Sequence, residues 1–309
     1  MLVPTNVKPP VTADNDLRLG HLITAQTDKL PKVVIVGFPS DEGISRNGGK
    51  VGASEAPDLI RQALYKLTPD PRTYDAFHRL LGQTLDAGNV SVSGEVESDQ
   101  QRLGSLIAQW LSEDVIPIIL GGGHETAFGH FLGYVEKNTP VEILNIDAHA
   151  DVRPLKGGLA HSGSPFYQAL EHPSRICEKY SVLGLAPWSV SRAHVQYLES
   201  KSASYNWLDE VTPALLEEHF GSLNKPTMVT LDMDAVAQGS APGVSAPAAM
   251  GLPLQVFCHA AFLAGTSRFV SSIDLVEVSP PHDIHERTTR AAALVIWHFL
   301  KGLAERLSQ

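Results

Sequence analysis

The chain has 309 residues, a hydrophobic content of 43% and a formal charge of −10, so it can bury a large core. Its lysines and arginines form no basic stripe, which argues against nucleic acid or an anionic membrane surface as a partner. No apolar run is long enough to span a bilayer, and the opening MLVPTNVKPP lacks the apolar stretch of a secretion signal. The two cysteines, Cys177 and Cys258, form neither a disulfide framework nor a CxxC spacing, so both are expected to be small buried side chains. These features predict a soluble, cytoplasmic protein.

Short apolar strands alternate with amphipathic helices along most of the chain. Residues 1–30 lack this alternation, and we expect an N-terminal arm there that packs on the surface or reaches a neighbouring subunit. The expected strands lie at 31–39, around 85, and at 115–120, 141–147, 179–186, 203–207, 227–234 and 269–278. The expected helices cover 54–67, 97–114, 126–137, 191–200, 212–220, 254–264 and 286–306, the first with Ser54 as its N-cap.

This alternation predicts an α/β fold with a mostly parallel sheet of about eight strands that is covered by helices on both faces. No linker rich in Pro, Gly or Ser interrupts the pattern, so residues 31–309 are expected to form a single domain. Ligands of such sheets gather at the carboxyl ends of the strands. Polar residues that follow strands are therefore the candidates for a functional site.

Polar residues follow four of the expected strands. The stretch LNIDAHADVR places Asp147, His149 and Asp151 at alternate positions where a strand ends. Side chains two apart on an extended chain point the same way, so these three groups are expected to leave one face. The other strand ends carry GGGHE with His124, VTLDMDA with Asp232 and Asp234, and SIDLVEVSP with Asp274 and Glu277.

Each of these signals has a purely structural explanation when it is taken alone. The glycine run can be a tight strand-to-helix turn, an Asp-x-Asp pair commonly caps a helix or bonds a loop, and a single histidine is usually a satisfied polar residue. Together they fall at one edge of one sheet, where crowded carboxylates resist burial unless a positive charge lies between them. We therefore expect a cation site.

The donor set indicates which cations fit. Two imidazoles and four carboxylates are too many for one small ion and suit two ions that share bridging carboxylates. Oxygen-rich donors with some imidazole and no thiolate favour manganese over structural zinc. Two such ions, about 3.5–4 Å apart, lower the pKa of a water between them toward neutrality. The expected chemistry is metal-assisted hydrolysis.

GGGH, DAHAD and the Asp-x-Asp strand end, in this order, resemble the ureohydrolase family of arginases, agmatinases and formimidoylglutamases, over residues 33 to 290. The resemblance implies a three-layer α-β-α sandwich, two Mn²⁺ ions per subunit and a homo-oligomer, either trimer or hexamer. It also implies the ligands of the two ions. One ion would be held by His124, Asp147, Asp151 and Asp232, and the other by Asp147, His149, Asp232 and Asp234.

Several segments look most like the formimidoylglutamase branch. These are GGGHE, with Glu125 where arginases usually carry Asp, HSGSPF at 161–166, PGVSAPAA at 242–249, and RNGGKVGAS at 46–54, with Lys50 where Arg is common. Arg153 stands where arginases carry a neutral amide, and its guanidinium offers a bidentate fork to a carboxylate. The implied substrate is N-formimidoyl-L-glutamate, which has two carboxylates close to its reacting carbon.

The implied reaction is attack of a metal-bridging hydroxide on the formimidoyl carbon, which yields L-glutamate and formamide in histidine degradation. Glu277 is expected to hold the amidinium cation, Asp151 to accept the first proton, and His161 to shuttle protons or contact the substrate. Arg153, Arg46 and Asn47 are expected to bind the substrate carboxylates. Structural roles stay open for these residues: a loop salt bridge for Arg153, an exposed loop histidine for His161, and bracing for Arg46 and Asn47.

Two other functions remain as alternatives. One is hydrolysis of agmatine, arginine or another guanidino compound, although agmatine has no carboxylate for Arg153 to bind. The other is a metal-binding scaffold without turnover. The histidines inside helical patterns are expected to be surface or packing residues, and Asp283 a cap acceptor; the histidines are His130, His194, His259 and His298.

Overall fold

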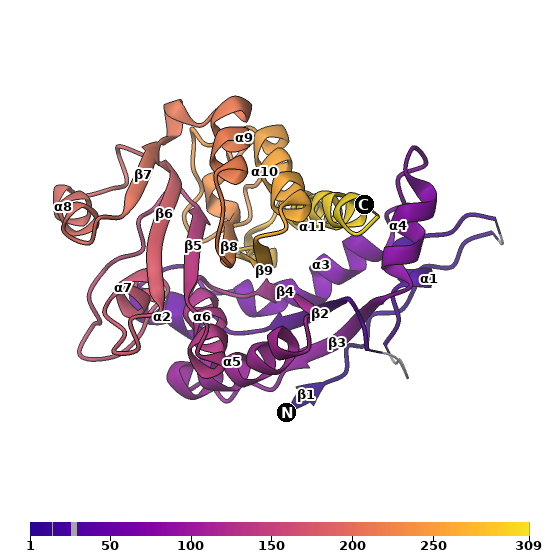
Figure 1. Cartoon of the computed structure of the whole chain (residues 1–309), viewed down its shortest axis with the longest axis horizontal. Helices are drawn as coiled ribbons and strands as arrows, with labels where there is room; N and C mark the ends of the chain where they lie inside the picture. The colour runs from indigo at the N-terminus through magenta and orange to yellow at the C-terminus, as the bar shows by residue number, and fades with distance from the viewer. Residues whose placement is uncertain (14, 26–29, 309) are drawn as a thin grey trace.

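The computed structural model describes residues 1–13, 15–25 and 30–308 (Figure 1). Parts of the expected N-terminal arm, residues 14 and 26–29, lie outside the described residues, as does residue 309.

A nine-stranded sheet forms the middle layer of the molecule. From β2 to β9 every neighbouring pair is parallel, whereas β1 pairs antiparallel with β3. The eight parallel strands agree with the sequence prediction, and β1 adds a ninth strand of two residues at one edge. The spatial order is β1 (Leu2–Val3), β3 (Thr84–Val90), β2 (Val33–Phe38), β4 (Ile116–Gly121), β9 (Val270–Val276), β8 (Thr227–Asp232), β5 (Val141–Ile146), β6 (Cys177–Leu185) and β7 (Ser204–Trp207).

Helices cover both faces of this sheet (Figure 1). Four helices, α1, α2, α4 and α7, were not expected from the sequence. The described helices are α1 (Leu19–Leu22), α2 (Glu42–Asn47), α3 (Ala56–Tyr65), α4 (Tyr74–Leu81), α5 (Val96–Ser112), α6 (Thr126–Lys137), α7 (Pro165–Leu170), α8 (Arg192–Ser200), α9 (Pro213–Gly221), α10 (Leu254–Thr266) and α11 (Arg287–Arg306).

Alternation along the strands produces two separate cores. Val33 and Ile35 of β2 belong to the core that α3, α10 and α11 cover, whereas Val34 and Val36 belong to the core under α5 and α6. Successive side chains of a strand point to opposite faces, so a fully apolar strand such as β2 fills both cores. The predicted three-layer α/β architecture is confirmed.

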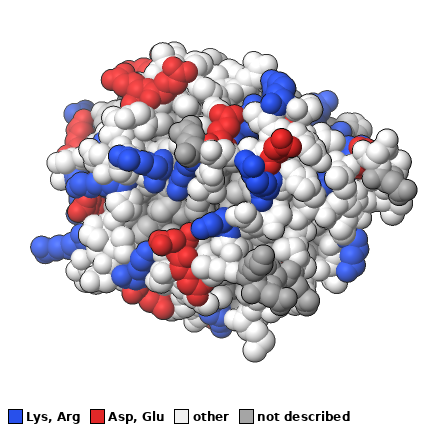
Figure 2. All heavy atoms as spheres, turned by 45° about the vertical axis from the view of Figure 1, so that its right-hand side comes forward, with Lys and Arg blue, Asp and Glu red and all other residues white. Residues whose placement is uncertain are grey.

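The sequence predicted no basic stripe on the surface and two buried cysteines. Basic and acidic side chains are interspersed on the face drawn in Figure 2. No helix in the described ranges has both the length and the apolar character that crossing a membrane requires. Both cysteines are free; Cys258 is buried as expected, but Cys177, at the start of β6, is only half-buried.

Candidate metal centre

The four strands that carry the polar motifs are neighbours in the sheet, in the order β4-β9-β8-β5. His124 follows β4, and Glu277 follows β9. Asp232 is the last residue of β8, and Asp147 follows β5 directly. Because all four strands are parallel, their carboxyl ends meet at one edge, as the rule for ligand sites in such sheets requires. The backbone N–H of His124 donates to Glu277 Oε1 at 2.8 Å, although 153 positions separate them.

The predicted ligands form two groups of donor atoms that share Asp147. The first group is His124, Asp147, Asp151 and Asp232, and the second is Asp147, His149 and Asp234, with the atoms of each group within 4.8 Å of one another. His124 Nδ1 lies 2.9 Å from Asp151 Oδ2 and 2.9 Å from Asp232 Oδ2. His149 Nδ1 lies 3.2 Å from Asp234 Oδ2. We call these six residues the donor cluster.

Turns rather than extended backbone bring the donors of each motif together. The His149 N–H donates to Asp147 Oδ1 at 2.7 Å, and the Asp234 N–H donates to Asp232 Oδ1 at 2.8 Å. Each first aspartate thus closes an Asx turn with one oxygen. The second oxygen of Asp147 accepts from Asn145 Nδ2 at 3.0 Å, and the second oxygen of Asp232 faces His124. The expectation of alternate positions on an extended chain was wrong here, because β5 ends at Ile146 and Asp151 has a positive φ of 47°.

The electrostatics of the donor cluster call for a cation. Burial and repulsion by Asp234 and Asp147 raise the pKa of Asp232 well above its usual range. Attraction by Asp234 raises the pKa of His149 despite its burial. His124 Nδ1 and Asp234 Oδ1 are buried without a hydrogen-bond partner among the described residues. Buried atoms without a hydrogen-bond partner, one in each ligand group, suit metal ions, since unpaired buried polar groups are otherwise costly.

Glu277 stands beside the donor cluster without belonging to either ligand group. Its carboxyl is buried, and it lies at a positive φ of 67°, a strained backbone conformation for a residue with a side chain. Burial, together with repulsion by Asp234 and Glu125, raises the pKa of Glu277 well above its usual range. A desolvated carboxylate of this kind has strong affinity for a cationic partner.

A cavity of about 200 Å³ opens over the donor cluster. Arg153 is the only lysine or arginine among its described lining residues. Segments 46–54 and 242–249, which resemble the formimidoylglutamase branch, both contribute residues to the wall of this cavity. The lining residues are Asn47, Gly48, Gly49, His149, Asp151, Arg153, Ser162, Asp232, Asp234, Ser245, Ala246 and Glu277.

Arg153 and Asn47 lie side by side on this wall. Arg153 Nη1 donates to Asn47 Oδ1 at 3.3 Å, and Asn47 Nδ2 donates to Ser162 Oγ at 3.1 Å. Arg153 makes no ion pair with an acid in the described part of the chain, so the loop salt bridge that the sequence left open is not formed. Its guanidinium remains available to an anion.

Two other predicted substrate or catalytic residues face away from the cavity. Arg46 donates to Glu97 Oε1 at 2.9 Å and to the Ala160 carbonyl at 3.1 Å, which joins α2 to α5 and to the loop before His161. His161 is buried rather than exposed; its Nδ1 accepts from Gly163 N at 3.2 Å and its Nε2 lies 3.1 Å from the Pro154 carbonyl. This geometry fits bracing of the loop that carries Arg153 and Ser162.

His130 and Asp274 are residues whose connection to the site sequence reasoning missed. Both are fully buried, and His130 Nδ1 lies 2.7 Å from Asp274 Oδ2. The helical periodicity of α6 gave packing as the simplest role for His130, and only the position of Asp274 on a motif-bearing strand hinted at more. Asp283, by contrast, is a cap acceptor as expected, since it accepts from the N–H groups of Thr288 and Thr289.

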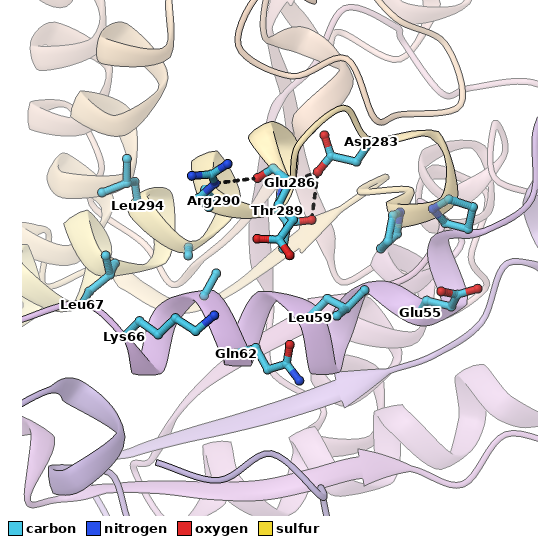
Figure 3. A pocket seen from close by; sticks show the side chains of 14 residues that line it. Glu55, Leu59, Gln62, Lys66, Leu67, Asp283, Glu286, Thr289, Arg290 and Leu294 are labelled. Carbon is cyan, nitrogen blue, oxygen red and sulfur yellow. Dashed lines mark hydrogen bonds between the residues drawn. The ribbon is translucent and has the colours of Figure 1, made fainter. Parts of the chain in front are cut away.

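A larger cavity, of about 630 Å³, lies between α3 and the segment from η4 (Pro280–His282) into α11 (Figure 3). Its aliphatic lining includes Leu59 from α3 and Leu67, which follows α3, on one side and Leu294 from α11 on the other. None of the metal-donor groups found among the described residues lies there. Size alone would favour this cavity as a binding site, but the convergent polar chemistry is at the smaller one.

The comparisons with known proteins agree with this geometry. The model of the Arginase family matches residues 31–301. The chain belongs to the arginase family. Among its relatives, the formimidoylglutamase of Rhodococcus opacus (strain B4) is 36% identical, with 92% of this chain and 91% of that protein covered. The formimidoylglutamase of Chromobacterium violaceum is 33% identical, with 88% of each covered.

Solved structures of formimidoylglutamases are similar to this arginase-family hydrolase. The Trypanosoma cruzi formiminoglutamase with Mn²⁺ is 32% identical, covers 94% of this chain and 100% of its own, and superposes with a TM-score of 0.86. Formimidoylglutamase from Bacillus subtilis shares the fold, with a TM-score of 0.82 at 24% identity and coverage of 96% and 94%. The family and branch expected from the sequence motifs are confirmed.

Proposed function

We propose that this chain is a binuclear manganese hydrolase that cleaves N-formimidoyl-L-glutamate to L-glutamate and formamide. One observation carries the proposal: among the described residues that line the cavity over the donor cluster, there is one guanidinium, Arg153, and a buried carboxylate, Glu277, that stands outside both ligand groups. A substrate with an anionic end and a cationic amidinium matches these two charges. Agmatine, with no carboxylate, leaves Arg153 without a partner.

The donor cluster would hold the two manganese ions. His124, Asp147, Asp151 and Asp232 make up one ligand group, and Asp147, His149 and Asp234 the other, so only Asp147 belongs to both. A second shared ligand, Asp232, is proposed from the resemblance to the family alone. Bound manganese would supply a nucleophile at neutral pH by lowering the pKa of water. Oxygen donors with two imidazoles fit manganese, and the Trypanosoma cruzi relative is described with it.

Side chains of this protein would orient the substrate. Glu277 would hold the amidinium through charge-assisted hydrogen bonds, with its Oε1 fixed by the His124 N–H. Arg153 would bind a substrate carboxylate, and Asn47, to which Arg153 donates, would hold the guanidinium in place. These contacts set the formimidoyl carbon over the donor cluster, where orientation lowers the barrier to attack.

Proton transfers complete the reaction. Asp151, which lines the cavity, would accept the first proton from the attacking water. The carbon–nitrogen bond to glutamate breaks once that nitrogen is protonated, and formamide leaves with the oxygen from water. His161 stays a prediction as the proton shuttle; in the present geometry both its ring nitrogens are engaged by backbone groups, and we propose that it orders the loop with Arg46.

A substrate panel with manganese-loaded protein tests the proposal. Glutamate, formamide and urea are measured separately after incubation with N-formimidoyl-L-glutamate, agmatine and arginine. We expect glutamate and formamide from the first compound only. Arg153→Lys, which keeps the charge but loses the fork, should raise KM at least about 10-fold with little change in kcat. Arg79→Lys, on α4 remote from the site, is the matched control; urea release from agmatine or arginine would transfer the proposal to the guanidino branch.

By its resemblance to the family, we also propose a cytoplasmic homo-oligomer, a trimer or a hexamer, whose only reactant partner is the small-molecule substrate. Sedimentation of the manganese-loaded protein would measure the number of subunits, and a monomer at micromolar concentration would contradict the proposed assembly.

A further inference from the structure

A series of buried hydrogen bonds starts at His124 Nε2 and runs to Thr230, Asp274 and His130. His124 Nε2 lies 3.0 Å from Thr230 Oγ1, and Thr230 Oγ1 donates to Asp274 Oδ1 at 2.6 Å. The other oxygen of Asp274 lies 2.7 Å from His130 Nδ1. Thr230, Asp274 and His130 are each 0% exposed, so water does not compete for these bonds.

The chemistry of these groups decides which atom donates and which accepts in each of these hydrogen bonds. An ionised carboxylate accepts hydrogen bonds only, so the single hydroxyl proton of Thr230 points to Asp274. The lone pairs of Thr230 Oγ1 are then left to accept, and His124 Nε2 must be the donor. His124 therefore carries a proton on Nε2, which leaves its Nδ1, facing Asp151 and Asp232, as the ring nitrogen that could bind a metal ion.

His130 provides the partner for the second oxygen of the buried Asp274. A buried carboxylate requires a paired charge or several hydrogen bonds, and His130 Nδ1 supplies the partner. The far side of the His130 ring is also held, because Nε2 lies 2.5 Å from Ser272 Oγ, which lies 2.6 Å from the Tyr134 hydroxyl. His124 lies two residues before α6 and His130 lies in its second turn, so the start of this helix sets the spacing between the two histidines.

We propose that Asp274 and His130 are a positioning pair that acts through Thr230 to hold His124 as a metal ligand. The inference rests on the proposed manganese site and extends it to residues that touch neither metal nor substrate. Ligand histidines in metal sites are commonly oriented by such an acceptor, and its loss weakens metal binding by about 10–100-fold. The effect should be unequal between the two ions.

The two ions should respond differently because His149, the histidine of the second ligand group, lacks such support among the described residues. His149 has a partly exposed side chain, and no chain of buried acceptors behind its ring is found in the described part of the molecule. The pair therefore supports the ligand group of His124 and not the group of His149 and Asp234. Disrupting it should release one ion before the other.

Manganese titration of matched variants tests the pair. Thr230→Val keeps the shape of the side chain and removes the hydroxyl, whereas Thr230→Ser keeps the hydroxyl as the conservative rescue. Asp274→Asn removes the charge that orients the chain. Tyr134→Phe removes a buried hydroxyl of the same network beyond His130 and is the control. Metal affinities are measured by calorimetry, and the coupling between two bound Mn²⁺ ions by electron paramagnetic resonance.

We expect Thr230→Val and Asp274→Asn to bind one ion about 10–100-fold more weakly and to show the spectrum of a single manganese at limiting metal. Thr230→Ser and Tyr134→Phe should bind two coupled ions like the parent protein. Parent-like affinity for both ions in Thr230→Val overturns the inference, as does equal weakening of both ions. If Asp274→Asn does not fold, the manganese affinities of Thr230→Val and Thr230→Ser still test the inference. A parent protein that binds no manganese refutes the proposed function instead.

Discussion

Glu277 is the clearest case of a single side chain held for chemistry rather than for packing. It is buried at the cavity wall, stands outside both ligand groups and adopts a positive φ of 67°. The N–H of His124 fixes one of its oxygens. Strain and desolvation at one carboxylate are tolerated when the surrounding structure needs that charge in that place, and an amidinium is the partner that our account assigns to it.

Glu277→Gln should therefore separate catalysis from metal binding. The amide keeps the shape and an oxygen for the His124 N–H but loses the negative charge. We expect kcat/KM for N-formimidoyl-L-glutamate to fall by at least about 10-fold, the loss of a charge-assisted hydrogen bond, while manganese content stays unchanged. Steady-state kinetics and elemental analysis of the same preparation check this; loss of metal together with activity would contradict the assigned role.

At the scale of elements, the run Gly121–Gly123 lies between β4 and His124 of the donor cluster and contacts the loop after β2. The Gly122 N–H donates to Phe38 O at 2.9 Å and the Gly123 N–H to Ser40 O at 2.8 Å. A Cβ at position 122 would lie 1.8 Å from the Ser40 carbonyl oxygen. The glycines thus permit close approach of two backbones, and this contact sets the segment of Asn47 against the strand end of His124.

Gly122→Ala should destabilise the protein strongly. The clash is with backbone, which cannot move aside as a side chain can, so we expect a loss of at least about 2 kcal/mol in the free energy of unfolding. Gly239→Ala is the matched control, because no atom lies within 4 Å of a Cβ there. Urea unfolding of both variants measures the difference; equal stability would show that the close approach can relax.

The strands of the sheet were predictable, whereas the short helices were not. Fully apolar runs such as β2 and β4 are long enough to be recognised as buried strands without any tertiary information. α2 and α7 have six residues each and show no periodicity of their own. Ser54 was wrong as a helix cap, because α3 begins after a 3₁₀ turn and the Ser54 N–H and hydroxyl bond to Asp41 instead.

At the scale of the whole molecule, the sequence located the donor cluster because its residues follow strands that the fold makes neighbours. The sequence could not predict which of the residues around that cluster line the cavity. Arg46 and Asn47 are adjacent in sequence, yet only Asn47 lines the cavity, while Arg46 binds Glu97. The brace from His130 to His124 runs through β8 and β9, and no local pattern records such a path.

The stability of the molecule should depend on His219 in mildly acidic solution. Burial on α9, with repulsion by Lys179, lowers the pKa of His219 to about 4. The unfolded chain then takes up the proton at higher pH than the folded one, so the stability present above about pH 6.5 is lost as the pH falls toward 4. Between pH 6.5 and pH 4, the free energy of unfolding of His219→Gln should fall less than that of the parent protein, by up to about 3 kcal/mol.

Urea unfolding of the two proteins between neutral pH and pH 4 measures this difference. His285→Gln, which replaces an exposed histidine, is the control. Parallel curves for the parent and His219→Gln would show that the imidazole is solvated in the folded protein.

Anomalous diffraction at the manganese edge tests the central claim most directly, because it locates the ions among named donors. For crystals grown with Mn²⁺, we predict two peaks that share Asp147, one between His124 and Asp151 and the other between His149 and Asp234. Crystals with the same manganese concentration that show no peak at these atoms, or one peak elsewhere, would contradict the account.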